Sequence, residues 1–261
     1  MFTPNVITSR ENNTVKYAGK LAANAAFRQS EQSFFAEGLK LCLALDAFLP
    51  CHSLFYTQKA LEKTPALVEV EAVHYLIEEH VAEKLADART HQGVFAIFAL
   101  PSATGDVLRK GGRYLALENV QDPGNVGTLL RSAAAFGFDA VLLSKGCASP
   151  FAPKTLRASM GAVAQIPVLE GVALPETLGQ LADVGVATLA AALYQSVPLS
   201  EVSQQQPDGV CIVIGSEGQG LTDATIAACS RAVRIPMTDK AESLNAGIAG
   251  SVLLWHFRGV E

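Results

Sequence analysis

The sequence predicts an α/β protein in which a small α/β domain precedes a larger domain built on a parallel sheet. In the second part of the chain, strand-like segments alternate with helical patterns, which indicates strand–helix–strand units. Each of these strand-like segments is almost wholly apolar, which is typical of a sheet covered by helices on both faces. Residues 101–112, between the two parts, are polar and rich in turn-forming residues at both ends, and they predict a linker.

Composition allows two filled cores but gives no direct sign of a nucleic-acid-binding protein. The 261 residues are 49% hydrophobic, so intrinsic disorder is not expected. The net charge of −5 contrasts with the basic surface that nucleic-acid binders usually carry. A local excess of basic over acidic residues nevertheless occurs in the first forty residues, and it fits an RNA contact and a solvated helix face equally well. The basic residues of this segment are Arg10, Lys16, Lys20, Arg28 and Lys40.

Cysteine and histidine spacing argues against disulfides and metal sites. The five cysteines are scattered, odd in number and never paired as CxxC, so we expect reduced, mostly buried thiols in a cytoplasmic protein. The five histidines show no metal-ligand spacing, and no metal is expected. The first ten residues lack the pattern of a signal peptide, and the longest apolar stretch, 39–56, is interrupted by charges and a proline, which argues against a membrane span.

The first domain, residues 1–100, shows both helical and strand-like patterns but no catalytic constellation. Apolar residues recur at helical spacing over 13–27 and 38–48, and short strands are predicted over 52–56 and 94–99.

In the second domain, residues 113–261, the alternation predicts which loops carry ligands. Strands are predicted over 114–120, 140–144, 166–169, 186–193, 210–214 and 231–235. Helices are predicted over 128–136, 153–160, 174–182 and 243–257. Ligands of parallel α/β sheets bind outside the carboxyl ends of the strands. The loops 121–127, 215–220 and 236–243 are therefore the candidate binding loops.

The first candidate loop places an arginine near a helix start. Asn125 is suited to cap the helix that follows. Gly127 and Arg131 are four residues apart and share one helix face, and a long side chain at Arg131 leans back over the unobstructed Gly127. A guanidinium beside a helix amino terminus favours a phosphate or another anion. An ordinary capped helix with a surface arginine remains the alternative.

The second candidate loop contains a single acidic residue, Glu217, among glycines. The spacing of residues 215–220 is GxxGxG, which is neither the dinucleotide-binding GxGxxG nor a P-loop. A nicotinamide-dependent enzyme is disfavoured because residues 121–127, after the first strand, also lack GxGxxG. At this position Glu217 is suited to bind substrate or to orient Arg131. A tight turn with a solvated glutamate is the alternative.

The third candidate segment leads into the last helix. We expect Ser243 to cap this helix and Asn245 to lie in its first turn. Glycine inside a helix costs about 1 kcal/mol relative to alanine. Gly247 and Gly250 therefore predict the close approach of another backbone.

Taken together, the three segments resemble the ordered signature motifs of the SpoU family, RNA 2′-O-ribose methyltransferases of the knotted SPOUT superfamily. These segments are Asn125-x-Gly127-x-x-x-Arg131, residues 214–221, and Ile235-Pro236-Met237 followed by Ser243-Leu244-Asn245. The first domain resembles the family's accessory substrate-binding domain, which is related to RNA-binding ribosomal proteins. The residues that carry this second resemblance are Ile7, Ser9, Asn12, Lys16, Phe35, Glu37, Gly38 and Gln92-Gly93-Val94.

The resemblance implies a deep trefoil knot in the second domain, a homodimer, and S-adenosylmethionine as cofactor. The cofactor would contact Gly215, Ile235 and Leu244 through backbone groups and would be flanked by Met237 and Leu193. The catalytic group would comprise Arg131, Glu217, Asn245 and Asn125, and RNA would contact Arg10, Lys16, Lys20 and Arg28.

The resemblance also implies methyl transfer to a ribose 2′-hydroxyl. Because arginine hardly ever deprotonates, Arg131 is better suited to anchor a phosphate and assist the departure of the hydroxyl proton than to act as a literal base. The additional first domain favours ribosomal RNA, of the large subunit, as the substrate. A tRNA 2′-O-methyltransferase and a non-catalytic RNA-binding protein of the same fold are the alternatives.

Overall fold

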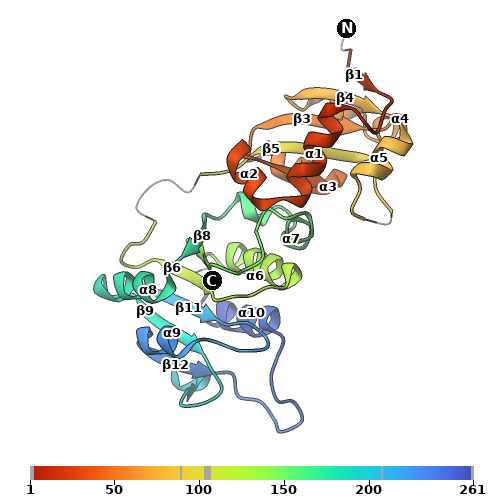
Figure 1. Cartoon of the computed structure of the whole chain (residues 1–261). Coiled ribbons are helices and arrows are strands. Elements are labelled where there is room, and N and C mark those ends of the chain that lie inside the picture. Colours follow the sequence, from red (N-terminus) through yellow and green to blue (C-terminus); the bar gives the residue numbers. More distant parts are fainter. Residues whose placement is uncertain (1–2, 89, 103–106, 207, 260–261) are drawn as a thin grey trace. The chain divides into compact units, whose positions relative to one another are not determined.

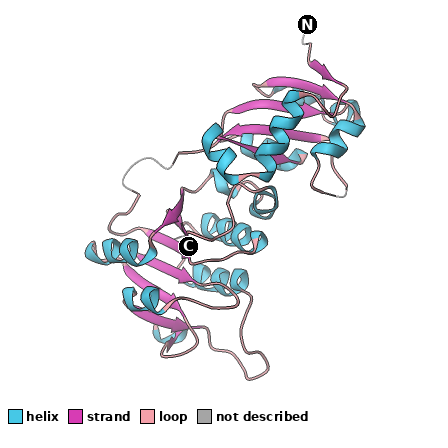
Figure 2. Ribbon diagram, in the orientation of Figure 1, coloured by secondary structure: helices cyan, strands magenta, loops and turns pink. Residues whose placement is uncertain are grey.

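The computed structural model describes residues 3–88, 90–102, 107–206 and 208–259, which form two compact units (Figures 1 and 2). The first unit contains residues up to 102 together with 151–164, and the second contains 103–150 and 165 onward. Of the predicted linker 101–112, residues 103–106 lie outside the described residues. The segment 151–164, expected within the second domain, packs with the first unit.

The first unit is built on a mixed five-stranded sheet. Its strands, in spatial order, are β1 (Asn5–Ile7), β4 (Val73–Ile77), β3 (Cys51–Tyr56), β5 (Val94–Ala99) and β2 (Ser33–Glu37). β4 runs parallel to β1 and β3, whereas β5 is antiparallel to β3 and β2. The core consists largely of aromatic side chains, and Phe35 stacks on Phe95 with ring centroids 5.9 Å apart.

Amide side chains accept hydrogen bonds from backbone N–H groups at the starts of three helices of the first unit. The helices are α1 (Asn13–Ala23), α2 (Ala25–Glu31), α3 (Leu39–Asp46), α4 (Gln58–Lys63), α5 (Glu79–Leu85) and α7 (Pro153–Ser159). The single helix expected over 13–27 is interrupted at Asn24, which ends α1 and accepts a hydrogen bond from Phe27 N to cap α2. Asn12 caps α1, and Gln92 accepts from Leu39 N at the start of α3.

A buried carboxylate attaches α7 to the rest of the first unit. Glu37, 4% exposed, accepts hydrogen bonds from Asp87 N and Ala88 N and from Arg157 Nη1 at 3.3 Å. Arg157 also pairs with Asp87 at 2.5 Å. Removing one partner of such a network leaves a buried charge uncompensated, which is strongly destabilising.

The second unit contains a seven-stranded sheet in which every described pairing is parallel, as the sequence predicted. Its strands, in spatial order, are β10 (Val197–Pro198), β12 (Arg231–Arg234), β9 (Ala187–Ala191), β11 (Val210–Ile214), β6 (Arg113–Leu117), β7 (Ala140–Ser144) and β8 (Val168–Val172). All five residues of β11 are buried. Its apolar run thus marks a strand covered on both faces.

Helices cover both faces of this sheet (Figure 1). They are α6 (Pro123–Ala135), α8 (Leu174–Asp183), α9 (Asp223–Ala228) and α10 (Ala246–His256). Alternate residues of a strand point to opposite faces. Cys211 and Val213 pack with Leu178 of α8, whereas Ile214 lies beneath Gly250 of α10.

The contact between α6 and α10 is close because α10 carries glycines where the two helices meet. A Cβ atom at Gly250 would lie 2.3 Å from Leu129 Cδ2, and one at Gly247 would lie 3.6 Å from Asn125 Cα. Ser132 of α6 and Ser251 of α10 share a 2.8 Å hydrogen bond between their hydroxyls. The expected close approach of a neighbouring backbone is found at Gly247, whereas at Gly250 the close neighbour is the Leu129 side chain.

The five cysteines are free thiols, as predicted, and three of them are buried. Burial, and secondarily the nearby Glu118 carboxylate, raises the pKa of Cys229 to about 12.

Within the described residues, no helix combines the length and apolarity required to cross a bilayer.

Candidate active site

The predicted binding loops follow neighbouring strands of the second sheet. β12, β9, β11 and β6 are adjacent in that order and parallel, so their carboxyl ends lie along one edge. Met237 follows β12, Leu193 follows β9, Glu217 follows β11, and Asn125 follows β6. Residues separated by more than a hundred positions in the sequence are therefore placed along one edge.

Asn125 and Glu217 contact each other directly across this edge. The side-chain amide Nδ2 of Asn125 donates a hydrogen bond to Glu217 Oε1. Asn125 was expected to cap α6, but this prediction is wrong. Asp122 is the cap, and its Oδ1 accepts from Asn125 N at 2.9 Å. The side chain of Asn125, within the first turn, is thereby available for Glu217.

Asn245 reaches the same place from the start of α10. It caps α10, with its Oδ1 accepting from Ile248 N at 3.2 Å, so the expectation that Ser243 is the cap is wrong. A Cβ atom at Gly247 would lie 3.0 Å from Asn125 Oδ1 and 3.2 Å from Asn245 Oδ1. The two amides therefore converge on Gly247, where any side chain would separate them.

Arg131, the fourth predicted catalytic residue, lies on the exposed side of α6. Gly127, one turn earlier, is buried, and no side chain extends from it over this face of the helix. Among the described residues, no hydrogen bond or ion pair is made by the Arg131 guanidinium, and Glu217 binds Asn125 rather than Arg131. The arginine thus remains able to bind an anion from solution.

Gly215 is required by the fold of its own loop. A Cβ atom there would lie 2.2 Å from the carbonyl carbon of Gly220 and 2.5 Å from Leu221 N. Gly220 N donates to Ser216 O at 2.9 Å, which folds the loop back on its origin. The backbone of residues 215–221 is therefore a compact structure that only glycine at 215 permits.

Apolar side chains are exposed in two of the loops at this edge of the sheet. Leu193, in the loop after β9, and Met237 and Leu244, in the loop between β12 and α10, are 46%, 37% and 36% exposed, which are large values for apolar side chains. Ile235, directly after β12, is partly buried. The adenine and methionine portions of S-adenosylmethionine would cover such surfaces, with backbone groups of the loops available for polar contacts. Within the described part of the chain, no group of three or more potential metal ligands occurs.

One set of polar residues at this edge was not predicted from the sequence. Glu118, directly after β6, accepts hydrogen bonds from Thr222 and Thr225. A second omission is Arg234, whose Nη1 donates to Ser196 O in the loop after β9. Glu118 is the first charged residue after an apolar strand, and that position was the only available signal.

Comparison with known proteins identifies the larger part of the chain. The model of the SpoU rRNA methylase family matches residues 112–255, more than half of the chain. The chain belongs to the SpoU rRNA methylase family. The model of an MRM3-like substrate-binding domain matches residues 12–96, within the first unit.

Two curated relatives support this membership. The chain is 32% identical over 197 residues to the 23S rRNA (guanosine(2553)-2′-O)-methyltransferase RlmP of Bacillus subtilis, an alignment that covers 76% of this chain and 77% of the relative. It is also 32% identical over 256 residues to an uncharacterized tRNA/rRNA methyltransferase of Synechocystis, with 97% of this chain and 93% of the relative covered.

Solved structures share the architecture of both units. An rRNA methyltransferase from Sinorhizobium meliloti with bound S-adenosylmethionine is 29% identical, with a TM-score of 0.83 and 97% of each chain covered. A putative RNA methyltransferase of the TrmH family from Porphyromonas gingivalis is 32% identical, with a TM-score of 0.82 and 95% and 98% coverage. The protein is therefore an S-adenosylmethionine-dependent RNA methyltransferase of the SpoU fold. The trefoil knot remains a prediction.

We expect Gly215→Ala to weaken binding of S-adenosylmethionine at least tenfold, about 1.4 kcal/mol, because the new methyl group displaces the Gly220 backbone. Isothermal titration calorimetry measures this affinity without RNA. Gly218→Ala is the matched control, since a Cβ atom at Gly218 meets nothing within 4 Å. Equal affinities of the two variants would remove residues 215–220 from the cofactor site.

Proposed function

We propose that the protein transfers a methyl group to a ribose 2′-hydroxyl of ribosomal RNA, of the large subunit. One observation carries this proposal: the side chains of Asn125, Glu217 and Asn245 converge beside the candidate cofactor loops. Arg131 lies on α6 together with Asn125, and among the described residues none pairs with its guanidinium. The similarity to RlmP, named as a 23S rRNA 2′-O-methyltransferase, supports both the ribose target and the class of RNA.

The proposed role of each residue follows from the polar groups of its side chain that make no hydrogen bond within the described part of the protein. S-adenosylmethionine supplies an electrophilic methyl group on its sulfonium. The 2′-hydroxyl is a poor nucleophile until its proton departs to solvent water, and a nearby positive charge favours that departure. Arg131 binds the phosphate next to the target ribose and stabilises negative charge on the 2′-oxygen. It acts as a charge rather than as a base, because the guanidinium remains protonated.

Asn125, Glu217 and Asn245 hold the ribose in register. Asn125 uses its amide N–H for Glu217, so its Oδ1 is available to accept a hydrogen bond from the ribose. Asn245 uses its Oδ1 for Ile248 N, so its amide N–H groups are available to donate. Orientation by such fixed groups contributes several kcal/mol to lowering a reaction barrier.

A deletion strain tests the reaction and the substrate together. Mass-spectrometric mapping of 2′-O-methyl groups in its RNA is expected to show the loss of one site in large-subunit ribosomal RNA, restored by the wild-type protein. Arg131→Ala should not restore it and should reduce kcat by at least a hundredfold, about 2.7 kcal/mol, while cofactor affinity changes less than threefold.

Arg231→Ala is the matched control, an exposed arginine at the amino end of β12. Loss of a tRNA site instead would redirect the substrate assignment to tRNA. An Arg131→Ala protein that methylates at the wild-type rate would eliminate the proposed role of this residue.

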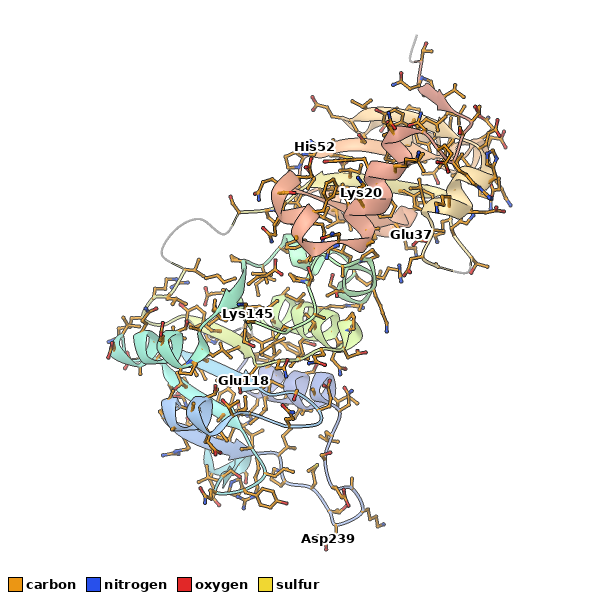
Figure 3. The ribbon with its side chains drawn as sticks, in the orientation of Figure 1. Lys20, Glu37, His52, Glu118, Lys145 and Asp239 are labelled. Atoms are coloured by element: carbon orange, nitrogen blue, oxygen red, sulfur yellow. The ribbon has the colours of Figure 1, made fainter. Side chains whose placement is uncertain are left out.

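The proposed RNA-binding residues of the first unit are reduced from four to three. Arg28 is 4% exposed and donates from Nη1 to Leu21 O and Ala22 O, so it stabilises the turn between α1 and α2 and is not a surface contact. Lys20 is exposed, with Nζ 5.7 Å from the centroid of the Phe27 ring (Figure 3). Arg10 and Lys16 are half exposed and form ion pairs with Glu83 and Glu11.

We expect the double substitution Lys16→Ala and Lys20→Ala to reduce the salt dependence of RNA binding. Each phosphate contact that is lost lowers the slope of log K against log salt by about 0.7 to 0.9, so two contacts lower it by about 1.4 to 1.8. Filter binding across a salt series measures the slope. Lys59→Ala with Lys63→Ala, two exposed lysines of α4, is the control pair. An unchanged slope places the RNA elsewhere.

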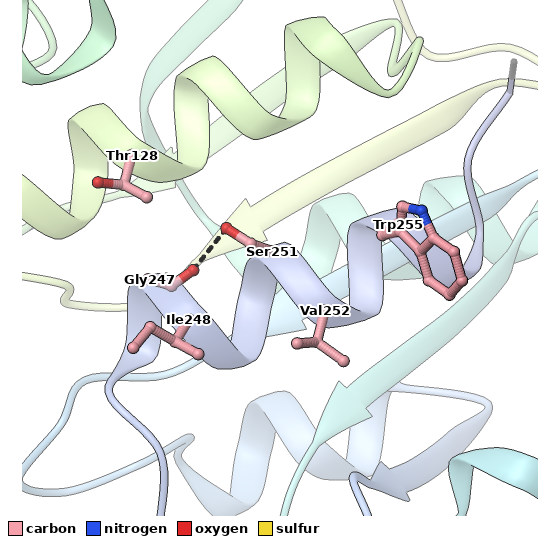
Figure 4. A pocket seen from close by; sticks show the side chains of 6 residues that line it. All are labelled: Thr128, Gly247, Ile248, Ser251, Val252 and Trp255. Atoms are coloured by element: carbon pink, nitrogen blue, oxygen red, sulfur yellow. Dashed lines mark hydrogen bonds between the residues drawn. The ribbon is translucent and has the colours of Figure 1, made fainter.

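We also propose that two copies of the chain pair through the outer face of α10. Thr128 of α6 and residues of α10 line an open pocket of about 320 Å³ (Figure 4). Ile248, Val252 and Trp255 follow one another along α10 at the spacing of one helix face and are 54%, 37% and 52% exposed. Such contiguous exposed apolar side chains are typical of an interface. A second copy is the occupant that the family resemblance implies.

Val252→Asp is expected to convert the dimer to a monomer, because it would bury a charge in an apolar interface. Size-exclusion chromatography with light scattering measures the mass. Val184→Asp, which alters a valine with 38% exposure at the end of α8, should leave the dimer intact. A wild-type protein that is monomeric at micromolar concentration would contradict the proposal.

Cytoplasmic localisation remains a prediction from the sequence.

A further inference from the structure

Glu118 makes a set of hydrogen bonds that the proposed chemistry does not use. Its carboxylate accepts from Thr222 N at 2.8 Å, from Thr222 Oγ1 at 2.9 Å and from Thr225 Oγ1 at 2.6 Å. The residue is partly buried and lies at the carboxyl end of β6, on the edge that carries the candidate site (Figure 3). A single carboxylate thereby connects two segments about a hundred positions apart in the chain.

The bonds of Glu118 hold both ends of one loop. Its backbone N–H donates to Ile214 O at 2.8 Å, at the end of β11, where the loop 215–221 begins. Its carboxylate binds Thr222, where the loop ends and α9 is capped. The compact turn of this loop, with its Gly220 N to Ser216 O bond, is thus fixed at both ends to the same residue.

The loop on the other side of Glu118 has separate supports. Asn119 adopts a left-handed conformation, with φ of 52°, and its N–H donates to Ser144 Oγ at 3.0 Å. Ala148 N donates to Val120 O at 2.9 Å. Losing the Glu118 carboxylate would therefore release the Thr222 end of the loop 215–221, while the segment that leads to Asn125 stays held by these contacts.

We propose that Glu118 is a positioning residue for S-adenosylmethionine, acting through the loop 215–221. The proposal rests on the assignment of that loop to the cofactor. Glu118 does not touch the cofactor. It holds Thr222 N–H and the two threonine hydroxyls, and so fixes the backbone that the cofactor contacts. Loss of the Glu118 carboxylate raises KM and Kd for S-adenosylmethionine, and because Glu217 lies in the same loop and binds Asn125, it also lowers kcat.

Three variants distinguish hydrogen bonding from charge. Glu118→Ala removes every side-chain acceptor and is expected to raise KM and the calorimetric Kd for S-adenosylmethionine at least tenfold, and to lower kcat because Glu217 lies in the same loop. Glu118→Gln is the conservative rescue, because its oxygen can accept from Thr222 N while its amide donates to the threonine hydroxyls. Its Kd is expected within threefold of wild type. Glu176→Gln, an exposed glutamate of α8, is the matched control.

A wild-type Kd for Glu118→Ala would overturn the proposal. A Glu118→Gln protein that binds as weakly as Glu118→Ala would also overturn it, since the effect would then follow the charge. Where Glu118→Ala fails to fold, Thr225→Val removes one donor at nearly constant volume, and a Kd raised by twofold or more in a folded Thr225→Val protein supports the proposal. An unchanged Kd in that variant overturns it.

Calorimetry of cofactor binding requires no RNA, so this test separates the two proposals. A wild-type protein that binds S-adenosylmethionine but methylates no ribose contradicts the proposed function and leaves the role of Glu118 standing. Normal 2′-O-methylation with a wild-type cofactor affinity in Glu118→Ala contradicts only the role of Glu118.

Discussion

Close packing of α10 on α6 is the contact on which the candidate site depends. Gly247 and Gly250 cost α10 about 1 kcal/mol each in helix propensity. Burial of Leu253 and Leu254, each contributing about 1.5 to 3 kcal/mol, more than offsets that cost. Since both helices start at the same edge of the sheet, this packing brings the side chains at their amino ends together. A larger residue at Gly247 would press on the side chains of Asn125 and Asn245, and one at Gly250 would clash with Leu129.

Helix caps determine which polar groups the site offers to a substrate. Asp122, Thr222 and Asn245 cap the three helices that leave this edge. Asn245 uses its side-chain oxygen to cap α10. Asn125 does not cap α6, because Asp122 does, and its side-chain nitrogen donates a hydrogen bond to Glu217. One amide therefore presents an acceptor and the other presents donors. Such a pair suits a hydroxyl, which both donates and accepts, better than it suits a bare anion.

The sequence was sufficient for the principal strands of the second unit, but it did not predict β1, β2 and β4 of the first unit or the correct helix caps. The limits of β7 and β11 were predicted at the observed residues, because β11 is an apolar run of five between glycines and β7 is an apolar run of four that ends at Ser144. The caps of α6 and α10 were misassigned because two candidate residues lie within three positions of each other at each helix start. The hydrogen bond from Asn125 N to Asp122 and the tertiary contact with Glu217 show that Asn125 is not the cap. The burial of Arg28 was likewise inaccessible, since a charged residue in a sequence gives no sign of the carbonyl groups that enclose it.

A net negative charge is compatible with RNA binding when the basic side chains that would contact RNA form only exposed ion pairs. Arg10 and Lys16 are half exposed and pair with Glu83 and Glu11, and exposed pairs of this kind contribute little net stability. A phosphate can replace the carboxylate in either pair at small cost, so both side chains remain competent to bind RNA. The neighbouring acids, and the net charge of −5, weaken attraction to RNA at large, which depends on unselective phosphate contacts. Under the proposed function, specific binding at one ribose depends on shape and on the geometry of Asn125, Glu217 and Asn245, and a low non-specific affinity would allow rapid release of the wrong RNA.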